Sequence, residues 1–479
     1  MEAQDSLPQD RVKLVASTGD ITTINHTTSP ESKDNHTRTS RSRDTVVSYF
    51  ENVQWAADGT TLLTYSSTNL VSGYIVPENL LTANTQLALE PQGEIQLPEP
   101  SNVLSGAPYF SLAAPWTQQL LVSARDHPIQ LFCLPPSPSS PSSSTTSSHS
   151  HSHSPISSFP FTKARSETFL SATSLLWPRP GTHFIAGSRS LLARFDITRT
   201  GEEPVTRIRT IPSERHLSKG GGVGMRGDIS ALGQQSIDEG NGASLVAAGT
   251  WTRWVGLYDF AQAGECVATW GIAAAVQGTD MTKTLNGSED SRGIGGDGIT
   301  QTTWSPCGRY LIICERKSRG ALIYDVRVTG KLLGYLTGRD ALGNQRIACD
   351  VFPGTDDNGG FEVWSGTSDG TVKVWQGVGS LEGPHAHAWG WAAHRSAISN
   401  SCLHSYGTVV ATCAGSWEFP DEDHDSACHS SSTHETSFNN DDCEGDTDTS
   451  ESDAESDTGH MSWMHRRNKE SSLKLWSIT

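Results

Sequence analysis

The sequence predicts an all-β protein, a single seven-bladed β-propeller, and three observations support this fold class. Short alternating apolar segments recur about seven times along the chain, and each copy contains a turn rich in Gly, Asp, Ser or Pro. Most copies close on an aromatic residue, at a spacing of roughly one propeller blade plus insertions. A blade buries both of its faces only against its neighbours, so the copies must pack side by side in a closed ring.

The clearest copy is WSGTSDGTVKVW, at residues 364–375, and it has two interpretations. Its GTSDG core fits the G-x-S-x-G motif, in which Ser368 would be the nucleophile of a hydrolase. A nucleophile elbow must lead from a strand into a helix, whereas the residues after Gly370 alternate like a strand. Ser-Asp-Gly between two strands is typical of a tight hairpin in which Gly370 has a positive φ. We therefore expect a turn here rather than a catalytic serine.

The other copies share this layout of strand, turn, strand, turn and closing strand. In chain order they are VQWAADGTTLLTYSSTNLVSGYIV, closing at Tyr74; YFSLAAPWTQQLLVSARDHPIQLFCL, closing near Phe132; LLWPRPGTHFIAGSRSLLARFDI, at Phe195; DISALG with SLVAAGTWTRWVGLYDF, at Tyr258; ITQTTWSPCGRYLIICERKSRGALIYDV, at Tyr324; and, after the Ser-Asp-Gly hairpin, ISNSCLHSYGTVVATCAG with SLKLWSI, at Trp476. Residues 11–15 near the N-terminus are the candidate strand that completes the last blade and closes the ring.

We expect the propeller to occupy residues 45–479. Residues 1–44 form an N-terminal segment that holds the closing strand near 11–15 and a disordered stretch. Composition predicts disordered loops at about 135–158, rich in Ser, Pro and His; at about 280–297, rich in Gly; and at about 418–468, rich in Asp, Glu, Ser and Thr. Only 35% of the chain is hydrophobic, which fits a globular core diluted by such segments.

Composition also limits the cellular setting and the class of partner. The net charge of −18 disfavours nucleic-acid binding, but much of it comes from the acidic insertion, and a sum can hide a basic patch. No apolar run is long enough to span a bilayer, and the N-terminus lacks the layout of a signal peptide. Cys314, Cys349 and Cys413 lie in apolar strand-like runs, which predicts reduced, buried thiols in an intracellular protein.

No pattern predicts catalysis or a bound cofactor. Carboxylate pairs, triads and metal clusters do not occur at usable spacing, so we expect a protein that is not an enzyme and holds no metal. His149, His151 and His153 alternate in the Ser-rich loop and could catch a metal weakly, but low-complexity drift is the simpler explanation. Cys428 and Cys443 lie in the acidic insertion at a spacing that matches no compact zinc module.

Two further patterns concern phosphate. The stretch KGGGVG, which begins at Lys219, lacks the Gly-Lys-Ser/Thr ending of a nucleotide-binding loop. It is either a flexible link between blades or a contact to a phosphate chain. Ser450 and Ser452 each have an acid three residues on, which makes them candidate phosphorylation sites for an acid-directed kinase. A solvated, unmodified spacer is the alternative.

Positive charge gathers in the turns of the fourth to sixth blades. Neighbouring blades of a ring present equivalent turns on one rim, so these residues could form a basic arc that binds the phosphates of RNA. The alternative is that polar turn residues are divided between both rims. The candidates are Lys219, Arg226, Arg253, Arg316, Lys317, Arg319, Arg327, Arg339 and Arg346. Trp251 or Trp254 could stack on bases, or could pack between blades as propeller aromatics commonly do.

Several stretches together resemble one known family. FENVQWAADGTTLLT, GTWTRWVGLYDF, GRDALGNQRIACDVFP with SGTSDGTVKVW, and AGSWEFPDED are similar to the telomerase Cajal body protein family of WD-repeat propellers. The more specific features are NQRI ahead of the Ser-Asp-Gly hairpin, and Phe419-Pro420 leading into an acidic break. The resemblance covers most of residues 46–476 outside the insertions. It implies a seven-bladed WD40-type scaffold that binds small Cajal body RNAs of the H/ACA type, including telomerase RNA in animals.

The resemblance also implies two alternative functions. Fungal relatives look like factors tied to spliceosomal small nuclear RNA biogenesis, and some are described as negative regulators of a G-protein α subunit. The main hypothesis is a scaffold whose partners are small nuclear or H/ACA-type RNA and its ribonucleoprotein proteins, in the nucleus (Cajal body or nucleoplasm) and also in the cytoplasm. The second is a protein-only, Gβ-like adaptor that binds a G-protein subunit through apolar and aromatic hot spots. Neither involves a membrane or DNA.

Overall fold

The computed structural model describes residues 11–21, 23–24, 46–134, 154–211, 225–235, 245–277, 293–354, 360–416 and 470–478. The chain divides into two compact units, Met1–Ser416 with Asn468–Thr479 and Trp417–Arg467, and the second unit lies outside these residues. Most of the three loops predicted at 135–158, 280–297 and 418–468 also lies outside them.

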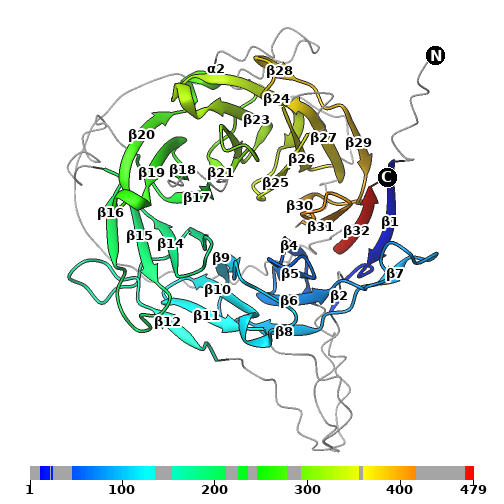
Figure 1. Cartoon of the computed structure of the whole chain (residues 1–479), viewed down its shortest axis with the longest axis horizontal. Coiled ribbons are helices and arrows are strands. Elements are labelled where there is room, and N and C mark those ends of the chain that lie inside the picture. The colour runs from blue at the N-terminus through cyan, green and yellow to red at the C-terminus, as the bar shows by residue number, and fades with distance from the viewer. Residues whose placement is uncertain are drawn as a thin grey trace, which may run out of the picture. The chain divides into compact units, whose positions relative to one another are not determined.

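The first unit is a ring of seven blades, each with four antiparallel strands, which confirms the predicted seven-bladed propeller (Figure 1). Two short strands, β7 (Leu87–Ala88) and β28 (Gly383–His385), pair in parallel with the outer strands of two blades. In the order in which their strands pair, the blades are β4 (Phe50–Trp55), β5 (Thr61–Ser66), β6 (Leu70–Ile75) and β8 (Gly93–Gln96); β9 (Ser101–Gly106), β10 (Gln119–Ala124), β11 (Ile129–Cys133) and β12 (Ser157–Phe159); β13 (Ser174–Leu176), β14 (His183–Ser188), β15 (Leu191–Asp196) and β16 (Thr206–Arg209); β17 (Ile229–Gln234), β18 (Leu245–Thr250), β19 (Trp254–Asp259) and β20 (Glu265–Gly271); β21 (Ile299–Trp304), β22 (Tyr310–Glu315), β23 (Ser318–Asp325) and β24 (Leu332–Ala341); β25 (Cys349–Pro353), β26 (Phe361–Gly366), β27 (Thr371–Val378) and β29 (Trp389–Ala392); and β30 (Ile398–Leu403), β31 (Val409–Ala414), β32 (Ser472–Ile478) and β1 (Val12–Ser17).

Both ends of the chain meet in blade 7. β1 pairs antiparallel with β32, in a register that runs from Val12 opposite Ile478 to Ser17 opposite Lys474. In Figure 1 the blue β1 accordingly lies beside the red β32. The N-terminal segment thus supplies the fourth strand of the last blade, where the sequence placed a closing strand.

Apolar side chains from adjacent blades form the core between them. Val255 and Leu257 of blade 4, for example, belong to one buried cluster with Leu311 and Ile313 of blade 5. Full burial of such a side chain stabilises the fold by about 1.5–3 kcal/mol. A blade therefore depends on both of its neighbours for its stability, as the radial architecture requires. The described cysteines are unpaired, and Cys314, Cys349 and Cys413 are buried as expected.

The Ser-Asp-Gly segment is the predicted hairpin, because the chain passes from strand β26 directly into strand β27. Gly370 has a φ of +87°, and a Cβ at this position would collide with the carbonyl oxygen of His394. The Ser368 hydroxyl accepts a hydrogen bond from the backbone N–H of Leu342 at 3.0 Å. Ser368 is therefore part of a turn, and the strand-to-helix geometry of a nucleophile elbow is not present here.

Strand direction divides the connecting loops between two rims. Within each blade, the turn between the second and third strands lies at the same end as the link from the fourth strand to the next blade. We call that end the upper rim, and the opposite end, with the first-to-second and third-to-fourth turns, the lower rim. Contacts between loops agree with this division, since Asp58 and Leu112, from two lower-rim turns, share a hydrogen bond of 2.6 Å.

On the upper rim of blade 7, five residues form a hydrogen-bonded set that we call the seam network: His394, Thr412, Glu470, Lys474 and Trp476. Trp476 Nε1 donates to Thr412 Oγ1 at 2.9 Å, and Thr412 Oγ1 lies 2.8 Å from His394 Nε2. Glu470 Oε1, 3.2 Å from His394 Nδ1, can only accept, so Nδ1 of the neutral imidazole donates to it and Nε2 accepts from the Thr412 hydroxyl. Lys474 Nζ completes the set, 2.7 Å from Glu470.

Candidate nucleic-acid interface

Three upper-rim loops from blades 4, 5 and 6 meet at Trp251. Trp251 lies in the β18–β19 turn, Arg316 in the β22–β23 turn, and Arg346 in the link from β24 to β25. The Arg316 Cζ atom lies 4.7 Å from the centre of a Trp251 ring, and the Arg346 Cζ atom lies 5.4 Å from it. We call these three residues the arginine cluster. The indole holds both guanidinium groups by cation–π attraction, worth about 0.5–1 kcal/mol for each at an exposed site.

Arg316 retains hydrogen-bonding capacity that the described residues do not use. Its Nε atom is buried and has no hydrogen-bond partner among them. A guanidinium stays charged at any physiological pH and presents its donors in a planar fork that matches a phosphate group. Arg316 is therefore a cation held over an aromatic ring. Because protein atoms cover its Nε, an anionic ligand would have to approach the terminal nitrogens of the guanidinium.

Arg253 lies in the same turn as Trp251, but its charge is already neutralised. Its Nε donates to Glu315 Oε1 at 2.6 Å and its terminal nitrogen to Oε2 at 3.2 Å. Glu315 is only 1% exposed and also accepts from the backbone N–H of Gly296. Loss of Arg253 would leave a buried carboxylate with little compensation, so Arg253 supports the turn that carries Trp251.

The other upper-rim candidates contribute weaker or diffuse charge. Lys317 lies 3.5 Å from Asp297, and the two side chains are 39% and 41% exposed, so solvent screens the pair and it adds little stability. Arg319 is exposed at the start of β23, and Arg226 lies in the link into blade 4. Lys219, Ser450 and Ser452 lie outside the described residues, as do the alternating histidines and the cysteines of the acidic insertion.

Two predicted members do not belong to the arc, and the structure corrects both. Arg327 follows β23 on the lower rim, where it forms a bidentate pair with Asp325 at 2.6 Å. Arg339 lies within β24 and is 0% exposed. Its guanidinium donates to Ser365 Oγ at 3.1 Å, to Ser318 Oγ at 3.2 Å and to backbone carbonyls. It therefore joins blades 5 and 6 internally and presents no charge to a ligand.

Both tryptophans are engaged within the protein. Arg316 and Arg346 lie over Trp251, so the indole holds two cations and does not offer a free face for base stacking. Trp254 packs against the buried cluster that includes Tyr258 and Phe260. Trp254 is therefore a packing residue, and Trp251 positions Arg316 and Arg346.

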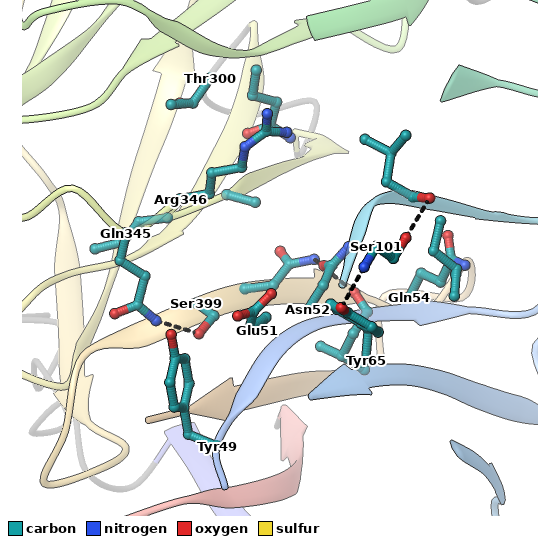
Figure 2. A pocket seen from close by; sticks show the side chains of 17 residues that line it. Tyr49, Glu51, Asn52, Gln54, Tyr65, Ser101, Thr300, Gln345, Arg346 and Ser399 are labelled. Carbon is teal, nitrogen blue, oxygen red and sulfur yellow. Dashed lines mark hydrogen bonds between the residues drawn. The ribbon is translucent and has the colours of Figure 1, made fainter. Parts of the chain in front are cut away.

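Beside the arginine cluster, a cavity of about 500 Å³ lies at the upper end of the ring axis. Figure 2 shows the side chains that line it. It is bounded by the upper ends of strands from several blades together with the β24–β25 link. Its polar lining includes Tyr49, Glu51, Asn52, Gln54, Gln301, Gln345, Arg346 and Asn400. Arg346 thus contacts Trp251 and also lines the cavity, which makes the cluster and the cavity one continuous site.

The cavity is lined by one carboxylate, Glu51 of blade 1, and one guanidinium, Arg346 of the link between blades 5 and 6. Burial raises the pKa of Glu51, an effect that a hydrogen bond from Tyr49 and the charge of Arg346 oppose. The Arg346 side chain is exposed, but nearby protein atoms partly desolvate its guanidinium and lower its pKa. The negative charge of Glu51 opposes this shift. The two charges therefore stabilise each other across the cavity.

The surrounding amides are fixed by hydrogen bonds within the wall. Asn400 Nδ2 donates to Asn52 Oδ1 at 2.9 Å, and Gln345 Nε2 donates to Ser399 Oγ at 2.6 Å. Gln54 is the exception, since its buried Nε2 has no partner in the described part of the chain. Such a prearranged polar wall suits a ligand that presents both donors and acceptors.

Other kinds of site are not evident in the part of the chain that the structure describes. Among those residues, no group of three or more His, Cys, Asp and Glu side chains is arranged to hold a metal ion. Within the same residues, no helix has the length and apolar character needed to cross a membrane.

Comparison with known proteins relates the chain distantly to two groups. No family model matches it. It is 24% identical over 377 residues to telomerase Cajal body protein 1 of Bos taurus, a match that covers 78% of this chain and 59% of that protein. The human protein of that name is 23% identical, with 78% and 58% covered. Guanine nucleotide-binding protein negative regulator 1 of Schizosaccharomyces pombe is 23% identical over 343 residues, with 71% and 73% covered.

These similarities and the fold identify a WD-repeat propeller protein. Its homologues are of a kind that typically serves as a non-catalytic scaffold. The chain spans about three fifths of the length of the Cajal body proteins that it matches.

Proposed function

We propose that this propeller is a non-catalytic scaffold that binds small nuclear or H/ACA-type RNA on its upper rim and assists ribonucleoprotein biogenesis or localisation. The observation that carries the proposal is the arginine cluster, in which a guanidinium with an unpartnered Nε lies over Trp251. Arg346 extends that cluster into a polar cavity at the ring axis. Cationic donors beside an enclosed polar pocket suit a ligand with a phosphate backbone and hydrogen-bonding bases.

Binding would depend mainly on phosphate contacts. Arg316 and Arg346, with the more exposed Lys317 and Arg319, would displace counterions from the RNA backbone, so affinity would fall steeply as salt rises. The net charge of −18 does not prevent RNA binding at this site. At ordinary ionic strength, a phosphate responds mainly to charges within about 10 Å, and the charges near the arginine cluster include several cations. The relatives named for the Cajal body support a nuclear location for this activity.

A second candidate is a protein adaptor that regulates a G-protein α subunit. The match to the fission yeast negative regulator covers 73% of that protein, more than is covered of the Cajal body proteins. On the lower rim, Trp116 is 73% exposed and Tyr406 is 82% exposed. Exposed aromatic side chains of this kind are common anchors of protein–protein interfaces. This function would use the rim opposite to the arginine cluster.

Crosslinking of the tagged protein in its own cells, with sequencing of the attached RNA, tests the proposal. We expect enrichment of small nuclear or H/ACA-type RNA, and its loss when Arg316, Lys317 and Arg319 are changed together to Ala. Arg327→Ala on the lower rim is the matched control and should retain the RNA. Recovery of no RNA above background, with signalling proteins copurified instead, would reject the RNA function and favour the adaptor.

A further inference from the structure

The axial cavity has an electrostatic character that restricts its ligand. It contains the Glu51 carboxylate and the Arg346 guanidinium, surrounded by uncharged amides and hydroxyls. A cationic ligand would meet repulsion from Arg346, and an anionic ligand would meet repulsion from Glu51. A neutral group with donors at one edge and acceptors at another satisfies both charges at once.

We propose that this cavity receives one guanine base from a single-stranded segment of the bound RNA. The inference rests on the proposed RNA-binding function and adds a base-specific pocket to it. A cavity of about 500 Å³ is within the range of small-ligand pockets and has room for one nucleotide. Proteins that recognise RNA sequence commonly take up unstacked bases in this way, since a base in a single strand is extruded at little cost.

Guanine is the base that matches a carboxylate with two hydrogen bonds. Its N1–H and exocyclic amino group are adjacent donors, which the two oxygens of Glu51 can accept together. Adenine and cytosine place a ring acceptor beside their amino donor, and uracil flanks its single N–H with two carbonyls. A carboxylate therefore gains less from each of them and is repelled by their acceptors.

The rest of the site complements the other edge of guanine and its phosphate. Arg346 offers donors for the O6 and N7 acceptors, a pairing that arginine commonly makes with guanine. The buried Gln54 Nε2 supplies one more donor that the described residues leave unused. Arg316 and Arg346 are both held near Trp251, with Cζ atoms 4.7 and 5.4 Å from the ring centre, so Arg316 would attract the phosphate chain on either side of the bound base.

Fluorescence anisotropy with short single-stranded RNAs tests the pocket. The probes are labelled oligouridines with one internal uridine replaced by guanosine, inosine, adenosine or cytidine. We expect the full-length protein to bind the guanosine probe about tenfold more tightly than the adenosine, cytidine and all-uridine probes. Inosine lacks the exocyclic amino group and should fall between, because it offers Glu51 one donor instead of two.

Variants separate the pocket from general RNA binding. Glu51→Gln should remove the preference for guanosine, so that the guanosine and all-uridine probes bind equally well. Glu78→Gln, which changes an exposed carboxylate on the lower rim, is the matched control and should keep the preference. Arg316→Ala should weaken binding to every probe by a similar factor.

Three results would overturn these ideas, and they are distinguishable. Equal binding of all probes, or a preference for another base, would reject the guanine pocket while leaving the RNA function intact. A guanosine preference that survives Glu51→Gln would also reject the pocket. Absence of binding to any probe would reject the proposed function itself. The nucleobase series uses the unaltered protein, so it remains decisive even if a variant fails to fold.

Discussion

The upper rim contains two groups of charged side chains that differ in how they use their hydrogen bonds. In the seam network of blade 7, Glu470 accepts from Lys474, from Ser472 and from the backbone N–H of Arg395, while His394 is enclosed between Thr412 and Glu470. In the arginine cluster, Arg316 and Arg346 lie over Trp251, and Arg316 Nε has no partner in the described chain.

The difference indicates what each group is for. A buried charge whose partners are all internal holds the fold together and has little left to offer a ligand. A cation that is held in place by an aromatic ring and is not saturated by internal partners can still attract an anion. We therefore expect changes in the seam network to affect stability, and changes in the arginine cluster to affect binding.

The largest effect on stability should come from Glu470→Ala. This change removes the acceptor for His394 and for Lys474 where the two ends of the chain close the ring. We expect the free energy of unfolding to fall by about 3 kcal/mol, because buried donors lose their partner. Urea unfolding measures the loss. Arg316→Ala is the comparison and should cost less than about 1 kcal/mol; similar costs for the two variants would remove the distinction between the groups.

Arg316→Ala should instead have the larger effect on RNA binding. We expect about a tenfold loss of affinity, and a slope of log affinity against log salt that is shallower by about 0.7, as for one phosphate contact to a single strand. Anisotropy titrations at several salt concentrations measure both quantities. Arg327→Ala on the lower rim should change neither. An unchanged slope in Arg316→Ala would show that this residue does not neutralise a phosphate.

The seam network should also make stability depend on pH, whereas the arginine cluster should not. Burial lowers the pKa of His394, so the unfolded chain takes up the proton first and stability falls as pH drops below the ordinary value of about 6.5. Between pH 7.5 and 5.5 we expect the wild type to lose about 1 kcal/mol of unfolding free energy relative to His394→Gln.

Comparison of these two proteins isolates His394 from Asp350. Burial raises the pKa of Asp350 to about 6, so this group gains stability as pH falls and works in the opposite direction. Urea unfolding at each pH provides the measurement. Parallel pH profiles for the wild type and His394→Gln would contradict the assignment.

The smallest effect is expected at Ser368, which belongs to neither group. Ser368→Ala removes one hydrogen bond to the Leu342 N–H, at a cost of about 1 kcal/mol or less. RNA affinity should be unchanged, because the residue supports a turn. Thermal unfolding and anisotropy titration check the two statements. Loss of a hydrolytic activity in a correctly folded variant would instead revive the nucleophile interpretation.

Much of the fold could be predicted because its signals are local. The Ser-Asp-Gly turn, its flanking strands and the positive φ of Gly370 all follow from residues close in sequence. Closure by residues 11–15 followed from the ring itself, since the last copy lacked a strand. The fourth strands were missed, because short outer strands such as β16 are partly exposed and lack a strong apolar alternation.

The missed fourth strand of blade 5 explains both errors in the basic arc. Without β24, Arg327 seems to begin a link to the next blade, and Arg339 seems to lie in a loop. One additional strand moves Arg327 to the lower rim and places Arg339 in the interior. The cavity could not be predicted either, because Glu51 and Asn400 come together only when the ring closes.

We propose that RNA contacts the upper rim through the arginine cluster. Photocrosslinking of a thiouridine-containing RNA to the purified protein, followed by mass spectrometry of the crosslinked peptides, tests it most directly. We expect crosslinks in the loops that carry Trp251, Arg316 and Arg346. Crosslinks confined to lower-rim peptides, such as those with Trp116 or Tyr406, would contradict it.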